Sequence, residues 1–190
     1  LGSAPNSMGL TRYKVQTADV AGSSSSIFQG DMVIPLTNGL VDVSAADGGS
    51  VAILGVMNGC EYIDLDGKPR FDNHYPGTAS IKSGTEASVF VYDNPFQVYE
   101  IQADASLTNA TTAQALVHSN AEGTGFGSEN GSTGKSIGEL SVASAGATTA
   151  TDNFRIIGIK DDFNDIDVTS AGVIFLVKLN LPFHTATTGL

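Results

Sequence analysis

Short runs rich in Val, Ile, Tyr and Phe recur along this chain, each bounded by Gly, Asp, Asn, Ser or Pro. Branched and aromatic side chains favour extended backbone, whereas the bounding residues favour turns. The pattern predicts strands over residues 11–17, 31–36, 40–44, 51–57, 60–65, 70–75, 87–92, 97–103, 137–142, 154–159 and 173–181. Many short strands at this spacing are typical of a β-sandwich or β-barrel.

Two of the predicted strands have a pattern of side chains that indicates their surroundings. Residues 89–92 (VFVY) are apolar on both faces, which predicts a strand that is buried on each side. Residues 99–102 (YEIQ) alternate between apolar and polar side chains. This second pattern predicts one buried face and one face in water.

Turn-forming residues separate several of these strands. Asn38-Gly39 and Asp66-Gly67 each lie between two strand-like runs. Asn, Asp and Gly tolerate the positive φ angles of a two-residue hairpin turn, so both pairs predict hairpins. The segment 93–95 (DNP) is expected to end a strand, because proline has no N–H donor for the ladder.

Helical signal is scarce. Residues 110–118 predict a helix of two or three turns, with Thr111 or Thr112 as its cap. A second, weaker segment at 165–170 contains β-branched residues that oppose a helix. The predicted fold class is therefore all-β: an antiparallel β-barrel or sandwich with long loops, an extended N-terminal arm and at most one short helix.

The chain of 190 residues has the length of one domain. We predict an N-terminal arm over residues 1–10, a single β domain over residues 11–184, and a C-terminal tail over residues 185–190. Within the domain, residues 121–135 contain five glycines among Ser, Thr, Asn and Glu, which predicts a long loop.

The charge of the chain argues against two classes of partner. Asp and Glu number 20 and Lys and Arg number 9, so the formal net charge is −11. Nucleic acids and anionic membranes both attract Lys and Arg, so neither is an expected partner. No apolar run approaches the roughly 18 residues of a membrane helix. The first nine residues lack the pattern of a signal peptide.

The sequence lacks the motifs of common catalytic sites. His74, His118 and His184 have no zinc-binding spacing, and no G-x-S-x-G nucleophile motif occurs. The glycine-rich segment 123–127 is not a phosphate-binding loop, because no strand leading into a helix surrounds it. Gly134-Lys135-Ser136 does not complete a P-loop either, because Glu129 occupies the position of the required first glycine. Cys60 is the only cysteine, and a buried small residue is the expected role for it. We expect no enzymatic activity and no cofactor.

Two acidic segments are weak candidates for a Ca²⁺ or Mg²⁺ site. The first is a hairpin that contains Asp64 and Asp66. The second is an acidic loop whose carboxylates belong to Asp161, Asp162, Asp165 and Asp167. Carboxylates are suitable ligands for these ions, but neither segment has the twelve-residue spacing of an EF-hand. Turns and solvated loops explain both segments without an ion.

The order of several motifs resembles that of a known family. The segments are 8–15 (MGLTRYKV), 27–36 (IFQGDMVIPL), 53–62 (ILGVMNGCEY), 92–102 (YDNPFQVYEIQ), 154–159 (FRIIGI) and 175–180 (FLVKLN). Together they resemble the head decoration, or cement, proteins of podovirus-type tailed bacteriophages. The resemblance covers residues 10–184, except for the glycine-rich loop.

This resemblance implies a β-barrel-like viral structural protein that is made in the host cytoplasm and binds the outer surface of the capsid. Such a subunit contacts the major capsid protein across capsomer boundaries and assembles with copies of itself as a trimer. The resemblance implies no activity and no cofactor.

Apolar side chains in the arm and at the surface would then serve as anchors between subunits. The candidates are Leu1, Pro5, Met8, Leu10, Phe28, Phe96 and Phe183. Burial in the core is the default alternative for the aromatic ones.

A different class of function is also open. All-β folds often carry carbohydrate- or receptor-binding sites on their loops, as in the fibres and other appendages of phages. Exposed aromatic side chains that stack on sugar rings would indicate this function. The absence of Trp and an aromatic content of 7% count against it.

Overall fold

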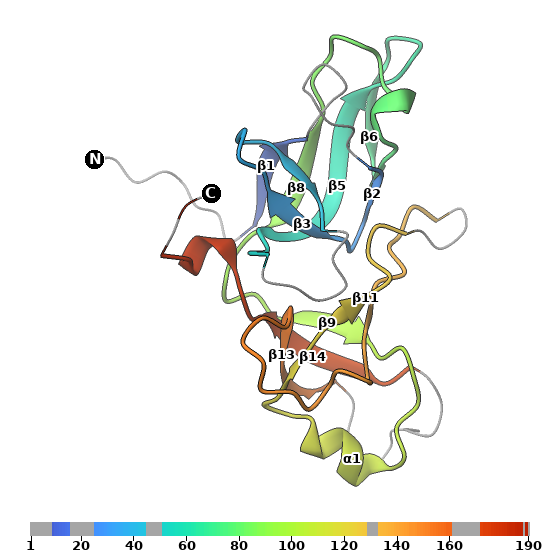
Figure 1. Ribbon diagram of the computed structural model, residues 1–190. Coiled ribbons are helices and arrows are strands. Elements are labelled where there is room, and N and C mark those ends of the chain that lie inside the picture. Colours follow the sequence, from blue (N-terminus) through green and yellow to red (C-terminus); the bar gives the residue numbers. More distant parts are fainter. Residues whose placement is uncertain are drawn as a thin grey trace.

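The computed structural model describes residues 9–15, 25–44, 51–128, 133–160, 172–187 and 189. Strands predominate in this part of the chain, and the single α-helix has six residues, so the all-β class is confirmed. The strands form two lobes that lie end to end (Figure 1). We call them the upper lobe, which contains β1 to β8, and the lower lobe, which contains β9 to β14.

The upper lobe is formed by the first half of the chain. Its elements are β1 (Leu10–Lys14), β2 (Ile27–Phe28), β3 (Met32–Pro35), β4 (Val41–Val43), β5 (Gly55–Ile63), β6 (Pro69–Asp72), β7 (His74–Tyr75), the 3-10 turn η1 (Thr78–Ser80) and β8 (Ser88–Tyr92). The main sheet has the order β1-β8-β5-β3-β4, and β6 pairs with β5. All of its ladders are antiparallel.

The lower lobe is formed by the second half of the chain. Its elements are β9 (Tyr99–Gln102), α1 (Ala110–Ala115), β10 (Asn120–Ala121), β11 (Gly123–Thr124), β12 (Glu139–Leu140), β13 (Phe154–Ile159), β14 (Ile174–Leu179) and the 3-10 turn η2 (Phe183–Thr185). The main sheet has the order β10-β13-β14-β9, and β11 pairs with β12.

Each lobe has its own apolar core. The upper core contains Val33, Met57, Tyr75 and Val89, and the lower core contains Phe175 and other strand residues. Alternation along the strands explains these cores, because every second side chain of a strand points to the same face. Two residues of the upper half, Met32 and Ile53, are fully buried in the lower core and so tie the lobes together. The backbone of Ile53 is further joined to Leu181 and Phe183 by hydrogen bonds of 3.0 and 2.8 Å.

Among the described residues, none of the sheets closes into a barrel. The upper sheet curls until Val15 and Val41 form an isolated bridge, but the described residues of β1 and β4 share no ladder. The arrangement of this part of the chain is therefore closer to the sandwich than to the barrel alternative. The single-domain prediction for residues 11–184 stays a prediction.

The predicted hairpins and the helix are confirmed, but the predicted two-residue turns are wrong, because each turn has three residues. Hydrogen bonds from the Leu36 N–H to Leu40 and from the Asp64 N–H to Lys68 close the two turns. Of each predicted pair only the glycine has a positive φ, 79° at Gly39 and 81° at Gly67. Helix α1 begins at Ala110 as predicted, but its cap is Asn109, whose side chain accepts a hydrogen bond from the Thr112 N–H. The segment 165–170 lies outside the described residues.

Two predictions about strands and one about a loop are wrong. Residues 51–57 and 60–65 do not form two strands, because the single strand β5, from Gly55 to Ile63, takes residues from both, with a bulge between Met57 and Gly59. The glycine-rich segment 121–135 is not wholly a loop, since β11 lies within it. Finally, β8 is buried on one face only.

On the covered face of β8, Val89 and Val91 are fully buried, whereas on the other face Tyr92 is 37% exposed and Phe90 is partly exposed. Strand β9 follows its prediction, because Ile101 is buried while Glu100 and Gln102 are exposed. None of the helices in the described residues has the length and apolar composition needed to span a bilayer.

Candidate binding site between the two lobes

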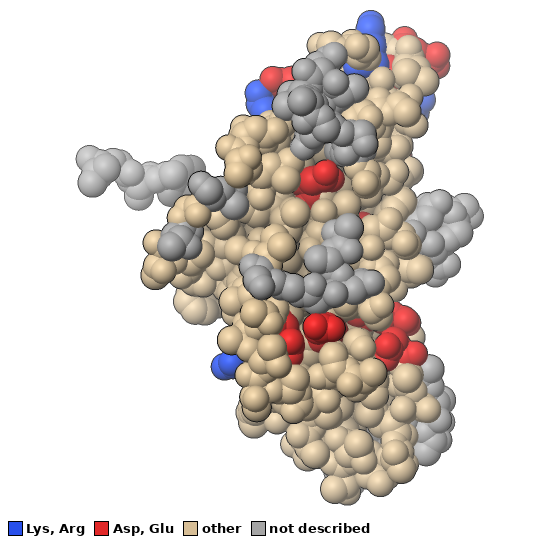
Figure 2. Space-filling model, viewed as in Figure 1, with Lys and Arg blue, Asp and Glu red and all other residues tan. Residues whose placement is uncertain are grey.

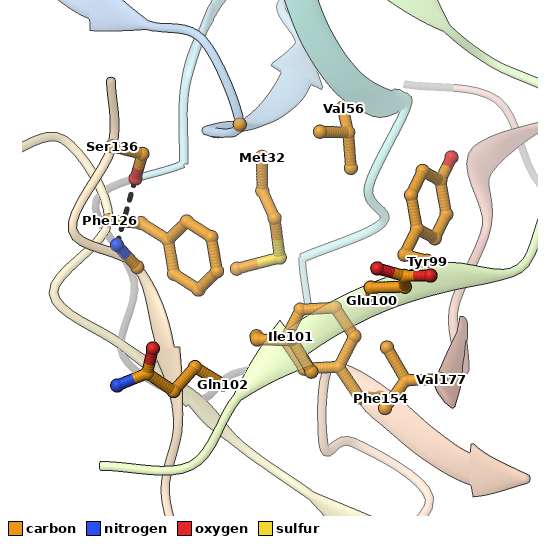
Figure 3. A pocket seen from close by; sticks show the side chains of 12 residues that line it. Met32, Val56, Tyr99, Glu100, Ile101, Gln102, Phe126, Ser136, Phe154 and Val177 are labelled. Atoms are coloured by element: carbon orange, nitrogen blue, oxygen red, sulfur yellow. Dashed lines mark hydrogen bonds between the residues drawn. The ribbon is translucent and has the colours of Figure 1, made fainter. Parts of the chain in front are cut away.

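A pocket of about 180 Å³ lies where the two lobes meet. Met32 and Val56 line it from the upper lobe, and Ile101, Phe126 and Phe154 line it from the lower lobe (Figure 3). Most of the labelled side chains around it are apolar. A cavity of about 150 Å³ with such a lining holds one benzene ring, so this pocket has room for a small apolar group.

The position of Phe126 depends on two glycines. A Cβ atom at Gly123 or at Gly138 would come within 2.4 Å of the Phe126 ring. Any larger residue at these positions would push the ring out of its place, because real atoms do not approach so closely. The glycine-rich composition of this segment is therefore explained by close packing around an aromatic ring, and not by flexibility alone.

A buried carboxylate fixes the same segment to the upper lobe. Asp31 is 0% exposed. Its Oδ1 accepts a hydrogen bond of 3.0 Å from the Gly127 N–H, and its Oδ2 accepts one of 2.9 Å from the Phe28 N–H. Burial raises the pKa of the Asp31 carboxyl above its ordinary value, although hydrogen bonds from Ser136, Gly127 and Phe28 act in the opposite direction.

The polar groups at the pocket are already engaged within the chain. Glu100 Oε2 accepts a hydrogen bond of 2.6 Å from Lys160 Nζ. The Tyr99 hydroxyl donates to the carbonyl oxygen of Tyr92 over 2.8 Å, and burial raises the pKa of Tyr99. On the face shown in Figure 2, acidic side chains gather across the middle of the molecule. These surroundings suit an uncharged apolar group and offer no paired nucleophile and base among the lining residues.

The predicted contact residues differ in their exposure to solvent. Leu10 is 37% exposed and Phe96 is 72% exposed, so both are accessible. Phe183 is partly buried against the upper core. Phe28 is 7% exposed and stacks on the His74 ring, so it is a core residue and the prediction of a subunit contact is wrong for it. Leu1, Pro5 and Met8 lie outside the described residues.

The described residues contain no group of three or more His, Cys, Asp or Glu side chains that is arranged to hold a metal ion. The acidic-loop candidates, Asp161, Asp162, Asp165 and Asp167, lie outside the described part of the chain. In the hairpin, Asp64 Oδ2 accepts a hydrogen bond of 2.7 Å from Arg70 Nε, and Asp64 Oδ1 accepts one of 2.8 Å from the Lys68 N–H.

Cys60 has the buried position that its sequence context indicates. Its side chain is in the upper core at 2% exposure, and its Sγ donates to the carbonyl oxygen of His74 over 3.0 Å. Burial raises the pKa of the Cys60 thiol to about 12, which suppresses the reactive thiolate.

Sequence patterns give little sign of the buried Asp31 carboxylate or of a second polar cluster, in which Tyr13 and His184 contact Asp93. The Gly30-Asp31 pair marks the entry to a strand, but burial of the Asp31 carboxylate depends on Gly127, 96 positions away. The cluster of Tyr13, Asp93 and His184 joins three distant segments, and none of its members has a motif.

The chain matches no protein-family model, no curated protein and no solved structure. The class that the fold itself defines is an all-β protein of two antiparallel lobes.

Proposed function

We propose that the chain is a decoration subunit of a tailed-phage head, which binds the major capsid protein across capsomer boundaries and stabilises the shell. The support is the resemblance over residues 10–184 together with one structural observation. Leu10 and Tyr92 are register partners at the start of β1, and each is 37% exposed. The predicted N-terminal arm therefore ends beside an exposed apolar pair on a well-anchored strand.

The anchoring of β1 matters for this role. All five residues of the strand pair with β8, and the backbone of Val15 continues the ladder with a hydrogen bond of 3.0 Å to Ala87. A strand held in this way transmits a pull on its N-terminal side directly to the sheet. A subunit that spans a boundary between capsomers needs such a rigid base, because its contact must oppose separation of the capsomers.

Assembly of several copies would strengthen the attachment. In a homo-oligomer, here a trimer, binding of one subunit raises the effective concentration of the others at the capsid surface. Weak apolar contacts through Leu10 and Phe96 then suffice. The net charge of −11 opposes aggregation of free copies.

Deletion of residues 1–9 tests the proposal. The variant is expected to keep the circular dichroism of the full chain, because β1 begins at Leu10. It is also expected to lose attachment to undecorated heads of the phage that encodes the chain, measured by co-sedimentation and electron microscopy. Leu10→Asp should weaken attachment as well, and Leu65→Asp, at an exposed hairpin position, is the matched control.

Two results would contradict the proposal. Full occupancy of the heads by the truncated protein would show that the arm is not the anchor. Failure of the full chain to bind any of the phage's heads would exclude the decoration function itself.

A further inference from the structure

The uncovered face of the upper sheet contains a hollow between two phenyl rings. Phe90 on β8 lies opposite Gly59 on β5, and Phe71 on β6 lies opposite Glu61, two residues further along β5. A depression of about 470 Å³, widely open to solvent, lies here, and Gly59 is among its lining residues.

Phe71 is the most exposed large apolar residue of the described chain, at 76%. Single exposed apolar side chains are common on protein surfaces and need no explanation. Phe71 differs because it borders a hollow whose opposite wall is a second aromatic ring and whose floor is a glycine. A Cβ at Gly59 would meet only the carbonyl oxygen of Asp72, at 3.2 Å, so the space above the glycine is otherwise free.

Asn58 and Asn73 also line the hollow, and internal hydrogen bonds orient their amide groups. Asn58 Oδ1 accepts from Gln29 Nε2 over 3.2 Å. Asn73 Nδ2 donates to the carbonyl oxygen of Thr133 over 2.7 Å. Asp72 is paired with the buried Cys60, so its side chain points to the other face of the sheet, where its Oδ1 lies 3.6 Å from His74 Nδ1. Such preorganised groups bind with less loss of conformational entropy than free side chains.

The combination of groups indicates the chemistry of a ligand. We propose that this hollow is a binding site for a neutral saccharide. A pyranose ring has an apolar C–H face that can lie against Phe71, and a rim of hydroxyl groups that can exchange hydrogen bonds with the amides of Asn58 and Asn73. A purely apolar ligand would leave these polar groups without partners.

The charges near the hollow disfavour anionic sugars. Its lining contains no Lys or Arg, and Glu61, opposite Phe71, places a carboxylate on the same face. Arg12, opposite Phe90, is also on this face, and its guanidinium pairs with Glu61. An acidic saccharide would therefore find no unpaired cation among the lining residues, whereas a neutral hexose or N-acetylhexosamine needs none.

A glycan array probed with the full chain tests the proposal. Binding to one or more neutral glycans is expected, and calorimetry with the best of them should give an affinity that Phe71→Ala lowers about tenfold or more. Phe96→Ala is the matched control, because it removes a phenyl ring of similar exposure, 72% against 76%, from outside the hollow. Asn58→Ala should also lower the affinity, whereas Phe96→Ala should leave it unchanged.

The results that would overturn the site are equally definite. An array without hits, binding confined to sialylated or sulfated glycans, or equal loss in Phe71→Ala and Phe96→Ala would each contradict it. Sedimentation of the same variants adds a further test. If Phe71→Ala dissociates an oligomer and glycan binding is absent, the hollow is a contact between copies of the chain. The site does not depend on head attachment, which the arm deletion measures separately.

Discussion

The Tyr13 hydroxyl donates a hydrogen bond of 2.6 Å to Oδ2 of Asp93, so the first strand is joined to the segment that leads out of the upper lobe. His184 Nε2 completes the cluster, 3.3 Å from the Tyr13 oxygen and 3.4 Å from Asp93 Oδ2. Burial, and then the adjacent Asp93 carboxylate, raise the pKa of Tyr13. Three segments that are remote in sequence therefore meet at one partly buried carboxylate.

Tyr13→Phe is expected to lower the free energy of unfolding by about 1–2 kcal/mol, because a hydrogen bond to a charged acceptor is lost. Urea denaturation at pH 7 measures this loss. Tyr92→Phe is the control, since Tyr92 is 37% exposed and its backbone carbonyl, not its hydroxyl, accepts the hydrogen bond from Tyr99. Equal stability of Tyr13→Phe and the natural chain would show that the Tyr13–Asp93 bond adds nothing to the fold.

Gly138→Ala is expected to destabilise the protein, because the new methyl group would collide with the Phe126 ring. Overpacking of a core typically costs about 1–3 kcal/mol. The matched control is Gly158→Ala, whose Cβ would make an ordinary contact of 3.7 Å with Leu176. In a Phe126→Leu background the cost of Gly138→Ala should shrink, which a double-mutant cycle detects. If Gly138→Ala costs the same in both backgrounds, the destabilisation does not arise from contact with the Phe126 ring.

The raised pKa of Asp31 predicts that the stability of the fold depends on pH, and it fixes the sign of that dependence. The folded chain holds this proton at a higher pH than the unfolded chain, so ionisation of Asp31 opposes folding. Its contribution to stability should therefore increase as the pH falls from 7.5 through the raised pKa, and level off below the ordinary value of 3.8.

The comparison of the natural chain with Asp31→Asn isolates this contribution, because the other titrating groups are common to both. Thermal unfolding followed from pH 7.5 down to about pH 3.8, the ordinary value, is expected to favour the natural chain increasingly at the lower pH. A difference that is constant with pH, or that moves the other way, would refute the assignment.

Cys60 should react very slowly with a thiol reagent in the folded protein. Its pKa is raised from 9.0 to about 12, so its thiolate population at neutral pH is lower by about a thousandfold, and its side chain is 2% exposed. Labelling with a chromogenic disulfide should reach one thiol per chain only in denaturant. Rapid labelling of the native protein would mean that the upper core opens readily.

Local patterns in the sequence were sufficient for the positions of most strands, two hairpin turns and the start of α1. The hairpins at Asn38-Gly39 and Asp66-Gly67 form where the sequence indicates them, because Gly39 and Gly67 adopt a positive φ without a steric cost. Likewise, the alternation in residues 99–102 predicts one buried and one solvent-exposed face, whatever the position of that strand in the sheet. Burial of Cys60 also follows from its residue type.

Tertiary structure alone decided which faces were covered and which distant groups met. The apolar run at 89–92 indicates a strand, but only the arrangement of the sheet leaves Phe90 and Tyr92 uncovered. The division of the strands into two lobes, the burial of Asp31 beneath Gly127, and the packing of Phe126 on Gly138 all join residues that are far apart in the chain. Alternation tells which side chains share a face of a strand, whereas the free energy of burial depends on what packs against that face.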